Sequence, residues 1–229
     1  MLRVGLTGGV GSGKTAAVAM LRELGAEVSQ SDEVGRALMQ PGTAVFAAIV
    51  AHFGEGVLTV DGLLDRAALA RIAFADGRVE ELNAIVHPAV IAAQAAWFDA
   101  VAAWDAEAVA VVESALIFET KHGAADGAPT WKDRFDRIVV LTAAEDVRRG
   151  RYIERVSGLD SVVAAADETG RIVADFGRRA VAQWSDARKA SLADFVVTNE
   201  GSLAELRTAM TGLFDVLKRE SVARAAEAK

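Results

Sequence analysis

The chain has 229 residues, a formal net charge of −7, a hydrophobic fraction of 52% and no cysteine. Its acidic balance argues against a general nucleic-acid-binding protein, and the missing cysteines exclude disulfides and cysteine-ligated metal sites. No apolar stretch approaches the length of a membrane span without an interrupting charge, and Met1 leads directly into an apolar strand. We therefore expect a cytoplasmic α/β protein with neither nucleic acid nor a membrane as partner.

A glycine-rich loop follows the first expected strand, residues 2–6. Gly8, Gly13, Lys14 and Thr15 match the phosphate-binding pattern of Gly, four residues, then Gly-Lys-Ser/Thr, and residues 16–24 have helical periodicity. Glycines let the backbone approach phosphate oxygens, and the loop N–H groups and the helix N-terminus attract anions. Lys14 is expected to reach the β- and γ-phosphates and Thr15 to bind Mg²⁺. The pattern predicts a nucleoside-triphosphate site made of Gly8, Val10, Gly11, Ser12, Gly13, Lys14, Thr15 and Ala16.

The second expected strand, residues 26–29, leads to Asp32 at the start of a helix. In an open parallel sheet such positions face the ligand crevice. A carboxylate there can bind a metal-bound water or accept a proton from a substrate hydroxyl. Alternatively, Ser31 or Asp32 is simply the helix N-cap. Local sequence leaves both interpretations open.

Helices are then expected at 43–53, from Arg66 to about Phe74, and over 76–103. Arg66 stands at a helix start, where the helix dipole disfavours a cation, so it is either a solvated arginine or a phosphate ligand. His87 is either a core histidine or a substrate contact. Pro88 beside it either begins a new helix or kinks one.

Three further strands are expected at 108–112, 137–141 and 194–199, and the apolar runs are typical of strands buried on both faces. Residues 121–131 read as a surface loop. Ser202 is expected to cap a closing helix that ends near Lys218, and the tail 220–229 is expected to fray.

Residues 148–189 concentrate arginine in a chain that is acidic overall. One interpretation is a solvated helical face paired with nearby acids. The other is a lid, residues 144–190, that closes arginines over a transferring phosphate. The phosphate loop favours the lid.

These motifs, in this order, resemble the dephospho-coenzyme A kinase family, and the resemblance covers nearly the whole chain. Gln183, Asp186, Ala187 and Lys189 also keep the family's spacing to Ala193-Asp194. The series that carries the resemblance is Gly5–Thr15, Ser31–Arg36, Asp61–Arg66, His87-Pro88, Leu116–Glu119, Ala193–Val197 and Asn199–Ser202.

The resemblance implies a single α/β domain, 1–229, with the three-layer sandwich of P-loop NTPases. It implies a five-stranded parallel sheet, a helical lid, and a helical acceptor-binding insertion at 32–103. The implied reaction is transfer of the ATP γ-phosphate to the ribose 3′-hydroxyl of dephospho-coenzyme A, with Mg²⁺, as the final step of coenzyme A synthesis.

By the same resemblance, Asp32 is the general base or holds the metal-bound water. Gln30 stands where the family pattern has another aspartate, so Asp32 is the remaining acid. Arg151 is our choice for the lid arginine that steadies the phosphoryl group, with Arg155 next. The acceptor is expected to contact Arg66, His87, Leu116 and Glu119, and the adenine to lie beside Asn199 and Gly201.

Two other functions are compatible with a phosphate loop. Another small-molecule P-loop kinase, acting on a nucleoside monophosphate or a metabolite hydroxyl, would share the fold and the loop. A regulatory GTPase would need an Asn-Lys-X-Asp guanine motif, which this sequence lacks.

Overall fold

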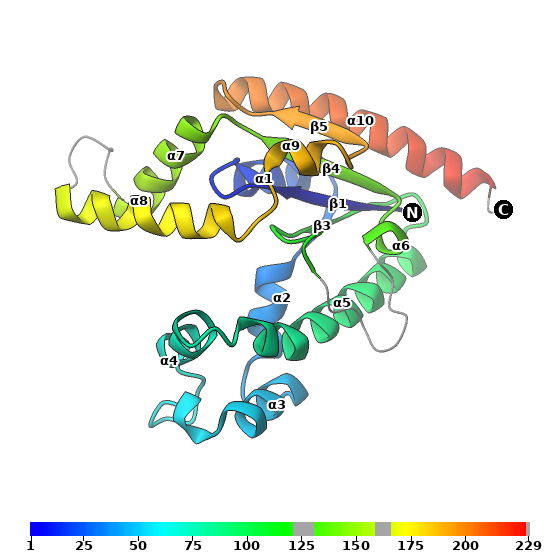
Figure 1. Ribbon diagram of the computed structural model, residues 1–229. Coiled ribbons are helices and arrows are strands. Elements are labelled where there is room, and N and C mark those ends of the chain that lie inside the picture. Colours follow the sequence, from blue (N-terminus) through cyan, green and yellow to red (C-terminus); the bar gives the residue numbers. More distant parts are fainter. Residues whose placement is uncertain (121–130, 159–165, 228–229) are drawn as a thin grey trace. The chain divides into compact units, whose positions relative to one another are not determined.

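The computed structural model describes residues 1–120, 131–158 and 166–227 (Figure 1). Most of the expected surface loop at 121–131 and the stretch 159–165 of the expected lid lie outside the described residues. Contacts divide the chain into two units. Unit 1 comprises Met1–Val28, Ala100–Glu119 and Phe135–Lys229, and unit 2 comprises Ser29–Asp99 and Thr120–Arg134.

The sheet has five strands in the order β2-β3-β1-β4-β5. β1 pairs in parallel with β3, where Leu2 faces Val109, and with β4, where Val4 faces Arg137. β4 pairs in parallel with β5. The expected five-stranded parallel α/β architecture is therefore confirmed. The strands are β1 Leu2–Gly8, β2 Glu27–Gln30, β3 Val109–Glu113, β4 Arg137–Thr142 and β5 Phe195–Thr198.

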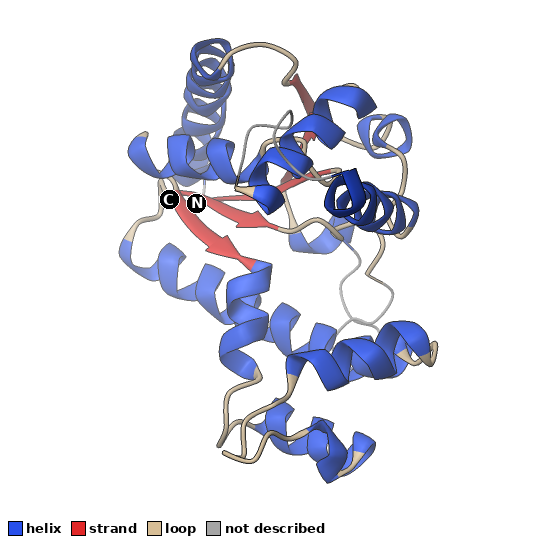
Figure 2. Ribbon diagram, turned by 90° about the vertical axis from the view of Figure 1, so that its left-hand side faces the viewer, coloured by secondary structure: helices blue, strands red, loops and turns tan. Residues whose placement is uncertain are grey.

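The core of unit 1 lies between the sheet and two helices, α1 (Lys14–Glu23) and α10 (Leu203–Glu227). Alternate residues of β1 point into this core because side chains alternate along a strand. On the opposite face of β1, a Cβ added at Gly5 would lie 2.8 Å from Ile138 Cδ1 and 2.9 Å from Ile117 Cδ1. Helices cover both faces of the sheet (Figure 2). This explains why the central strands read as continuous apolar runs.

The arginine-rich segment of unit 1 forms three helices: α7 (Glu145–Ser157), α8 (Ala166–Val181) and α9 (Asp186–Ala190). Tyr152 and Ile153 of α7 pack with Ile172 and Phe176 of α8, and Val10 of the glycine-rich loop packs against them. The α7–α8 pair thus has its own apolar cluster beside the phosphate loop.

Unit 2 is built from short helices around a small core of Val45, Ile49, Val57 and Leu69. Apart from the long helix α5, its elements are α2 Ser31–Leu38, α3 Ala44–Phe53, the 3₁₀ helix η1 Glu55–Val57, α4 Arg66–Ala70, the π-helical turn η2 Arg71–Ala75 and α6 Trp131–Arg134.

Helix α5 runs from Val79 to Trp104 with Pro88 inside it, so the proline does not begin a new helix. By length and composition α5 is apolar enough to cross a membrane, contrary to our expectation. One such helix is weak support for a membrane segment, because core helices meet the same criterion. Gln94 of α5 is buried, donates to Ser31 Oγ at 2.8 Å and accepts from Arg134 Nη2 at 2.9 Å. Within unit 2 this helix therefore makes polar contacts in addition to the apolar packing of Leu82, Ile85 and Val86 against the core.

The closing helix is longer than predicted. α10 continues to Glu227 rather than ending near Lys218, so the prediction of a fraying tail from 220 is wrong through residue 227. Ser221 Oγ donates to the carbonyl oxygen of Ala108 at 2.8 Å, and Ala225 is buried. The apolar stripe of the helix continues through these small residues at spacings of one helical turn, a signal weaker than that of large side chains.

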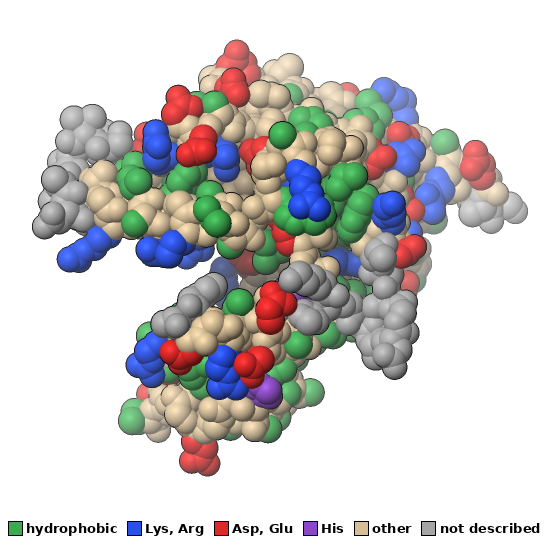
Figure 3. Space-filling model, viewed as in Figure 1, with side chains coloured by type: hydrophobic (Ala, Val, Ile, Leu, Met, Phe, Trp, Pro, Cys, Tyr) green, Lys and Arg blue, Asp and Glu red, His purple; other side chains and the backbone are tan. Residues whose placement is uncertain are grey.

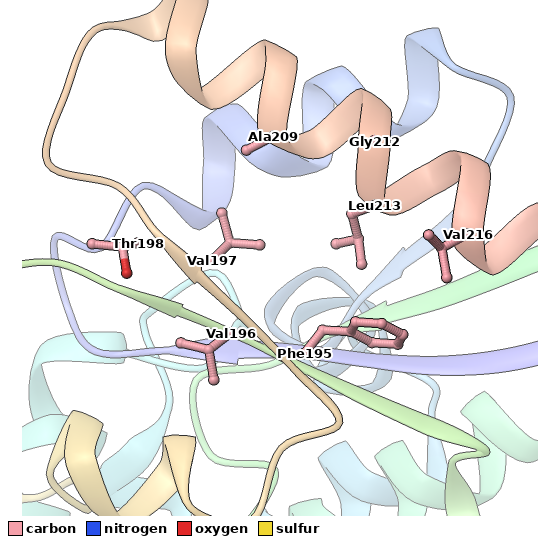
Figure 4. Close-up of a pocket in the computed structure, with 8 residues that line it drawn as sticks. All are labelled: Phe195, Val196, Val197, Thr198, Ala209, Gly212, Leu213 and Val216. Carbon is pink, nitrogen blue, oxygen red and sulfur yellow. The ribbon is translucent and has the colours of Figure 1, made fainter.

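A groove of about 380 Å³ lies between β5 and α10 (Figure 4). Its lining is apolar except for Thr198, and it includes Phe195, Val197, Leu213 and Val216. None of its lining residues belongs to the phosphate loop, so the groove does not include that loop.

Candidate active site

The glycine-rich loop joins β1 to α1 at the carboxyl end of the sheet. Gly11 and Gly13 have φ of 79° and 96°, and Gly13 is the N-cap of α1. Only glycine adopts these conformations without strain. Ser12 N donates to Gly9 O at 3.2 Å, which closes the turn. This arrangement presents loop amides and the start of a helix to an anion.

Lys14 begins α1 and folds back over the loop. Its Nζ donates to the carbonyl oxygens of Gly8 at 2.8 Å and Gly9 at 3.1 Å. Burial lowers the pKa of Lys14 from 10.5 to about 8, opposed by Glu113 and assisted by the nearby positive charges of Lys189 and Arg155. A desolvated cation held in this way is poised to bind phosphate charge.

A second loop borders the first. Asn199, which follows β5, is buried, and its Nδ2 donates to Ser12 O at 2.9 Å. A Cβ at Gly13 would collide with that amide, so the last glycine of the loop also makes room for Asn199. Arg151 Nη1 donates to Asn199 O at 2.7 Å, and Arg151 Nη2 donates to Gly201 O at 3.3 Å. Three predicted site residues, Arg151, Asn199 and Gly201, thus meet beside the phosphate loop.

The arginines of the expected lid divide into two groups. On α8, Arg178 and Arg179 are mostly exposed and both pair with Asp175. Figure 3 shows basic side chains (blue) gathered along α8. These are a solvated face, as one of our two interpretations held. On α7, Arg151 binds the Asn199 loop and Arg155 is near enough to Lys14 to lower its pKa.

Glu119 lies inside unit 1, where its partners are residues to which our sequence reasoning assigned no role in the site. Its Oε1 accepts from Trp184 N at 2.8 Å and forms an ion pair with Lys189 Nζ at 2.9 Å. Lys189 is fully buried and also donates to Ala115 O at 2.8 Å. The other oxygen of Glu119, Oε2, is buried and accepts no hydrogen bond from the described residues. Buried charges need partners, so this pair ties the segment after β3 to α9.

An aromatic stack adjoins this pair. The rings of Phe118 and Trp184 are stacked, with centroids 5.9 Å apart, and Arg188 Cζ lies 3.3 Å from the Trp184 ring centroid. Leu116, in the same segment, is half-buried, and its N–H donates to Ser114 Oγ at 3.2 Å. The family-like spacing of Lys189 was the one sequence signal for this cluster; nothing local pointed to Trp184.

The predicted acid, Asp32, and the predicted acceptor contacts Arg66 and His87 lie in unit 2. Asp32 is exposed in the first turn of α2, whose N-cap is Gln30. Neither Ser31 nor Asp32 is the N-cap, so that alternative is wrong. Ser31 instead accepts from Gln94, which fixes the turn that carries Asp32.

Arg66 is the exposed first residue of α4. The carboxylate of Asp65 caps this helix by accepting from Ala67 N and Ala68 N, at 2.8 and 3.1 Å. An acid at the cap offsets the dipole penalty that an arginine meets there. His87 is half-buried in α5. Both remain predicted acceptor contacts.

A parallel five-stranded sheet, a glycine loop after β1 and a lysine at the start of the next helix define a P-loop kinase fold. A crystal structure of a protein from Thermus thermophilus is similar, with a TM-score of 0.69 and 28% identity over 94% of this chain and 97% of that one. Dephospho-CoA kinase from Campylobacter jejuni has the same fold, with a TM-score of 0.63 and 16% identity over 95% and 98% of the two chains.

The family model described as dephospho-CoA kinase matches residues 2–205. Dephospho-CoA kinase of Leifsonia xyli is 36% identical over 90% of this chain and 93% of its own length. That of Geobacillus kaustophilus is 37% identical over 90% and 92%. The chain belongs to the dephospho-CoA kinase family and is a kinase.

Proposed function

We propose that the protein transfers the γ-phosphoryl group of ATP to the ribose 3′-hydroxyl of dephospho-coenzyme A. The hydroxyl oxygen forms the new P–O bond, the bond to the β-phosphate oxygen breaks, and ADP leaves. The observation that carries the proposal is the phosphate loop with Lys14 folded over it, in a chain that matches the family from residue 2 to 205. ATP as donor follows from family membership.

On the donor side, the loop N–H groups bind the phosphates of ATP. The residues that contact the nucleotide here are Gly8, Val10, Gly11, Ser12, Gly13, Lys14, Thr15 and Ala16. Lys14 neutralises charge on the β- and γ-phosphates, because its buried ammonium group has few competing water contacts. Asn199 and Gly201 border the adenine. Arg151 and Arg155 steady the transferring phosphoryl group as the lid closes. Arg151 is hydrogen-bonded to the Asn199 loop, and the positive charge of Arg155 lowers the pKa of Lys14.

The oxygen donors of the chain fit Mg²⁺. Thr15 is exposed in the first turn of α1, and Asp32 is exposed in the first turn of α2. Among the described residues no group of three His, Cys, Asp or Glu side chains is placed to hold a metal. Mg²⁺ needs no such cage, since it keeps several waters and binds through one or two protein oxygens plus phosphates. When bound, the ion would neutralise charge on the phosphates.

On the acceptor side, Asp32 takes the proton of the 3′-hydroxyl or holds a metal-bound water. Arg66, His87 and Leu116 contact the acceptor. Glu119 contributes its second carboxylate oxygen, Oε2, which has no hydrogen-bond donor among the described residues. A buried acceptor atom without a donor is costly unless a ligand supplies one. We place the enzyme in the cytoplasm, where ATP is available.

A coupled ADP-release assay with a panel of acceptors tests the reaction. Turnover of dephospho-coenzyme A, with AMP and shikimate inactive, is the expected result. Turnover of AMP or shikimate alone would instead favour the rival small-molecule kinase.

Asp32→Asn tests the acid, with Glu33→Gln, its exposed neighbour in α2, as the matched control. The expected result for Asp32→Asn is a fall in kcat of about 10²- to 10⁴-fold, the usual contribution of general base catalysis, with ATP affinity nearly unchanged. Equal kcat values in the two variants would exclude a catalytic role for Asp32.

A further inference from the structure

Arg148 of α7 is a partly enclosed arginine to which the mechanism above gives no role. Its side chain is 13% exposed and that of Asp186 is 17% exposed, and Arg148 Nε lies 3.5 Å from Asp186 Oδ2. Nε also donates to Ala143 O at 3.1 Å, and Cζ lies 5.9 Å from the centroid of the Phe176 ring. The side chain is therefore oriented by groups from α8, α9 and the end of β4.

The same side chain lies against the phosphate loop at Gly9. A Cβ added at Gly9 would lie 2.5 Å from Arg148 Nη1 and 2.8 Å from Asp186 Oδ1. Gly9 does not have the positive φ that makes Gly11 and Gly13 necessary. At Gly9, therefore, a larger residue is opposed by the Arg148–Asp186 pair, whose side-chain ends would have to move, and not by the backbone angle. Two positions further on, a Cβ at Gly11 would collide with the carbonyl oxygen of Arg148.

Arginine suits this position because its guanidinium group is planar, permanently charged and able to lie against a ring and a carboxylate together. Lysine would keep the charge but not the shape. The side chain of Arg148 thus lies against Gly9 and its backbone against Gly11, while Phe176 and Asp186 connect it to α8 and α9.

We propose that Arg148, oriented by Asp186, is a positioning residue that holds the outer side of the phosphate loop and couples it to helices α7–α9. The proposal rests on the proposed function only for the choice of acceptor, dephospho-coenzyme A, in the measurement of kcat. The loop would then adopt its nucleotide-binding shape only when these helices are in place.

The first test compares Arg148→Met and Arg148→Lys with Arg149→Met, which changes the exposed neighbouring arginine on the same helix. We expect Arg148→Met to lower ADP affinity and kcat each about tenfold, equivalent to about 1.4 kcal/mol. Arg148→Lys should recover part of the loss, and Arg149→Met should match the unaltered protein. Equal values for Arg148→Met and Arg149→Met, or a loss accounted for by unfolding at the assay temperature, would overturn the proposal.

The second test is a double-mutant cycle between Gly9→Ala and Arg148→Ala, read by calorimetric titration with ADP. Alone, Gly9→Ala places a methyl group where Arg148 Nη1 lies and should weaken ADP binding about tenfold. In the Arg148→Ala background the guanidinium group is gone, and Asp186 Oδ1, 2.8 Å from the added Cβ, has lost the ion-pair partner that holds it there. The same methyl group should therefore cost clearly less ADP affinity than it does beside Arg148. An equal cost in both backgrounds would overturn the proposal. Because ADP binding needs no acceptor, this result stands apart from whether dephospho-coenzyme A is the substrate.

Discussion

Breaking the buried ion pair between Lys189 and Glu119 by removing one partner should strongly destabilise the protein. Lys189 is fully buried and Glu119 is 11% exposed, so Lys189→Met would leave a buried carboxylate whose one remaining donor among the described residues is Trp184 N. Removing one partner of a buried pair costs about 3–5 kcal/mol. At about 2–4 °C per kcal/mol for a chain of this size, Tm should fall by about 6–20 °C.

The measurement is urea and thermal unfolding of the unliganded protein, and two further variants make it decisive. Lys218→Met removes a half-buried lysine that donates to one carbonyl, Glu107 O, and should cost only about 1 kcal/mol. The double variant Lys189→Met with Glu119→Leu removes both charges and should recover most of the loss. If Lys189→Met cost no more than Lys218→Met, or the double variant were as unstable as Lys189→Met, the electrostatic argument would be refuted.

Three other predictions concern the donor site and the lid. Lys14→Met should lower kcat by at least about 10²-fold without lowering Tm, because a desolvated cation is removed; kinetics and differential scanning calorimetry check both parts. Arg151→Ala should raise KM for ATP about tenfold, since a charged donor that orders the Asn199 loop is lost, and unchanged ATP kinetics would contradict this. The pKa of Asp175 is lowered to about 2 by hydrogen bonds from Tyr152 and Arg179. Because the folded-state pKa of Asp175 lies below the ordinary value of 3.8, the ionised carboxylate stabilises the folded protein above about pH 4. This contribution to the free energy of unfolding is lost as pH falls toward 2. Asp175→Asn should flatten the decline of Tm over that range; an identical decline in the variant would count against it.

Sequence reasoning succeeded where the determining residues are contiguous. The phosphate loop needs one stretch of about eight residues, and its glycines carry their own conformational requirement at Gly11 and Gly13. The apolar runs predicted the buried strands for the same reason, because a strand between two helical layers is apolar throughout. Boundaries were less secure. α10 continues because small residues, Ser221 and Ala225, pack in place of large apolar ones.

The roles of the arginines followed from tertiary contacts. Arg148, Arg151 and Arg155 lie within two turns of one helix and have similar local sequence. Their partners come from distant segments: Asp186 and Gly9 for Arg148, and the Asn199 loop for Arg151. Nothing in the spacing of the arginines reveals which of them faces the phosphate loop.

The sequence by itself determined that this chain binds a triphosphate, folds around a parallel sheet and carries the motif series of its family. Those properties depend on backbone conformation and hydrophobic pattern, which act over a few residues at a time. Only the tertiary structure paired Glu119 with Lys189, placed Asn199 against Ser12, and set Arg148 beside Gly9. Such contacts join residues 70 or more positions apart, and a charge or an amide buried by folding takes its partner from whatever segment the fold brings within reach.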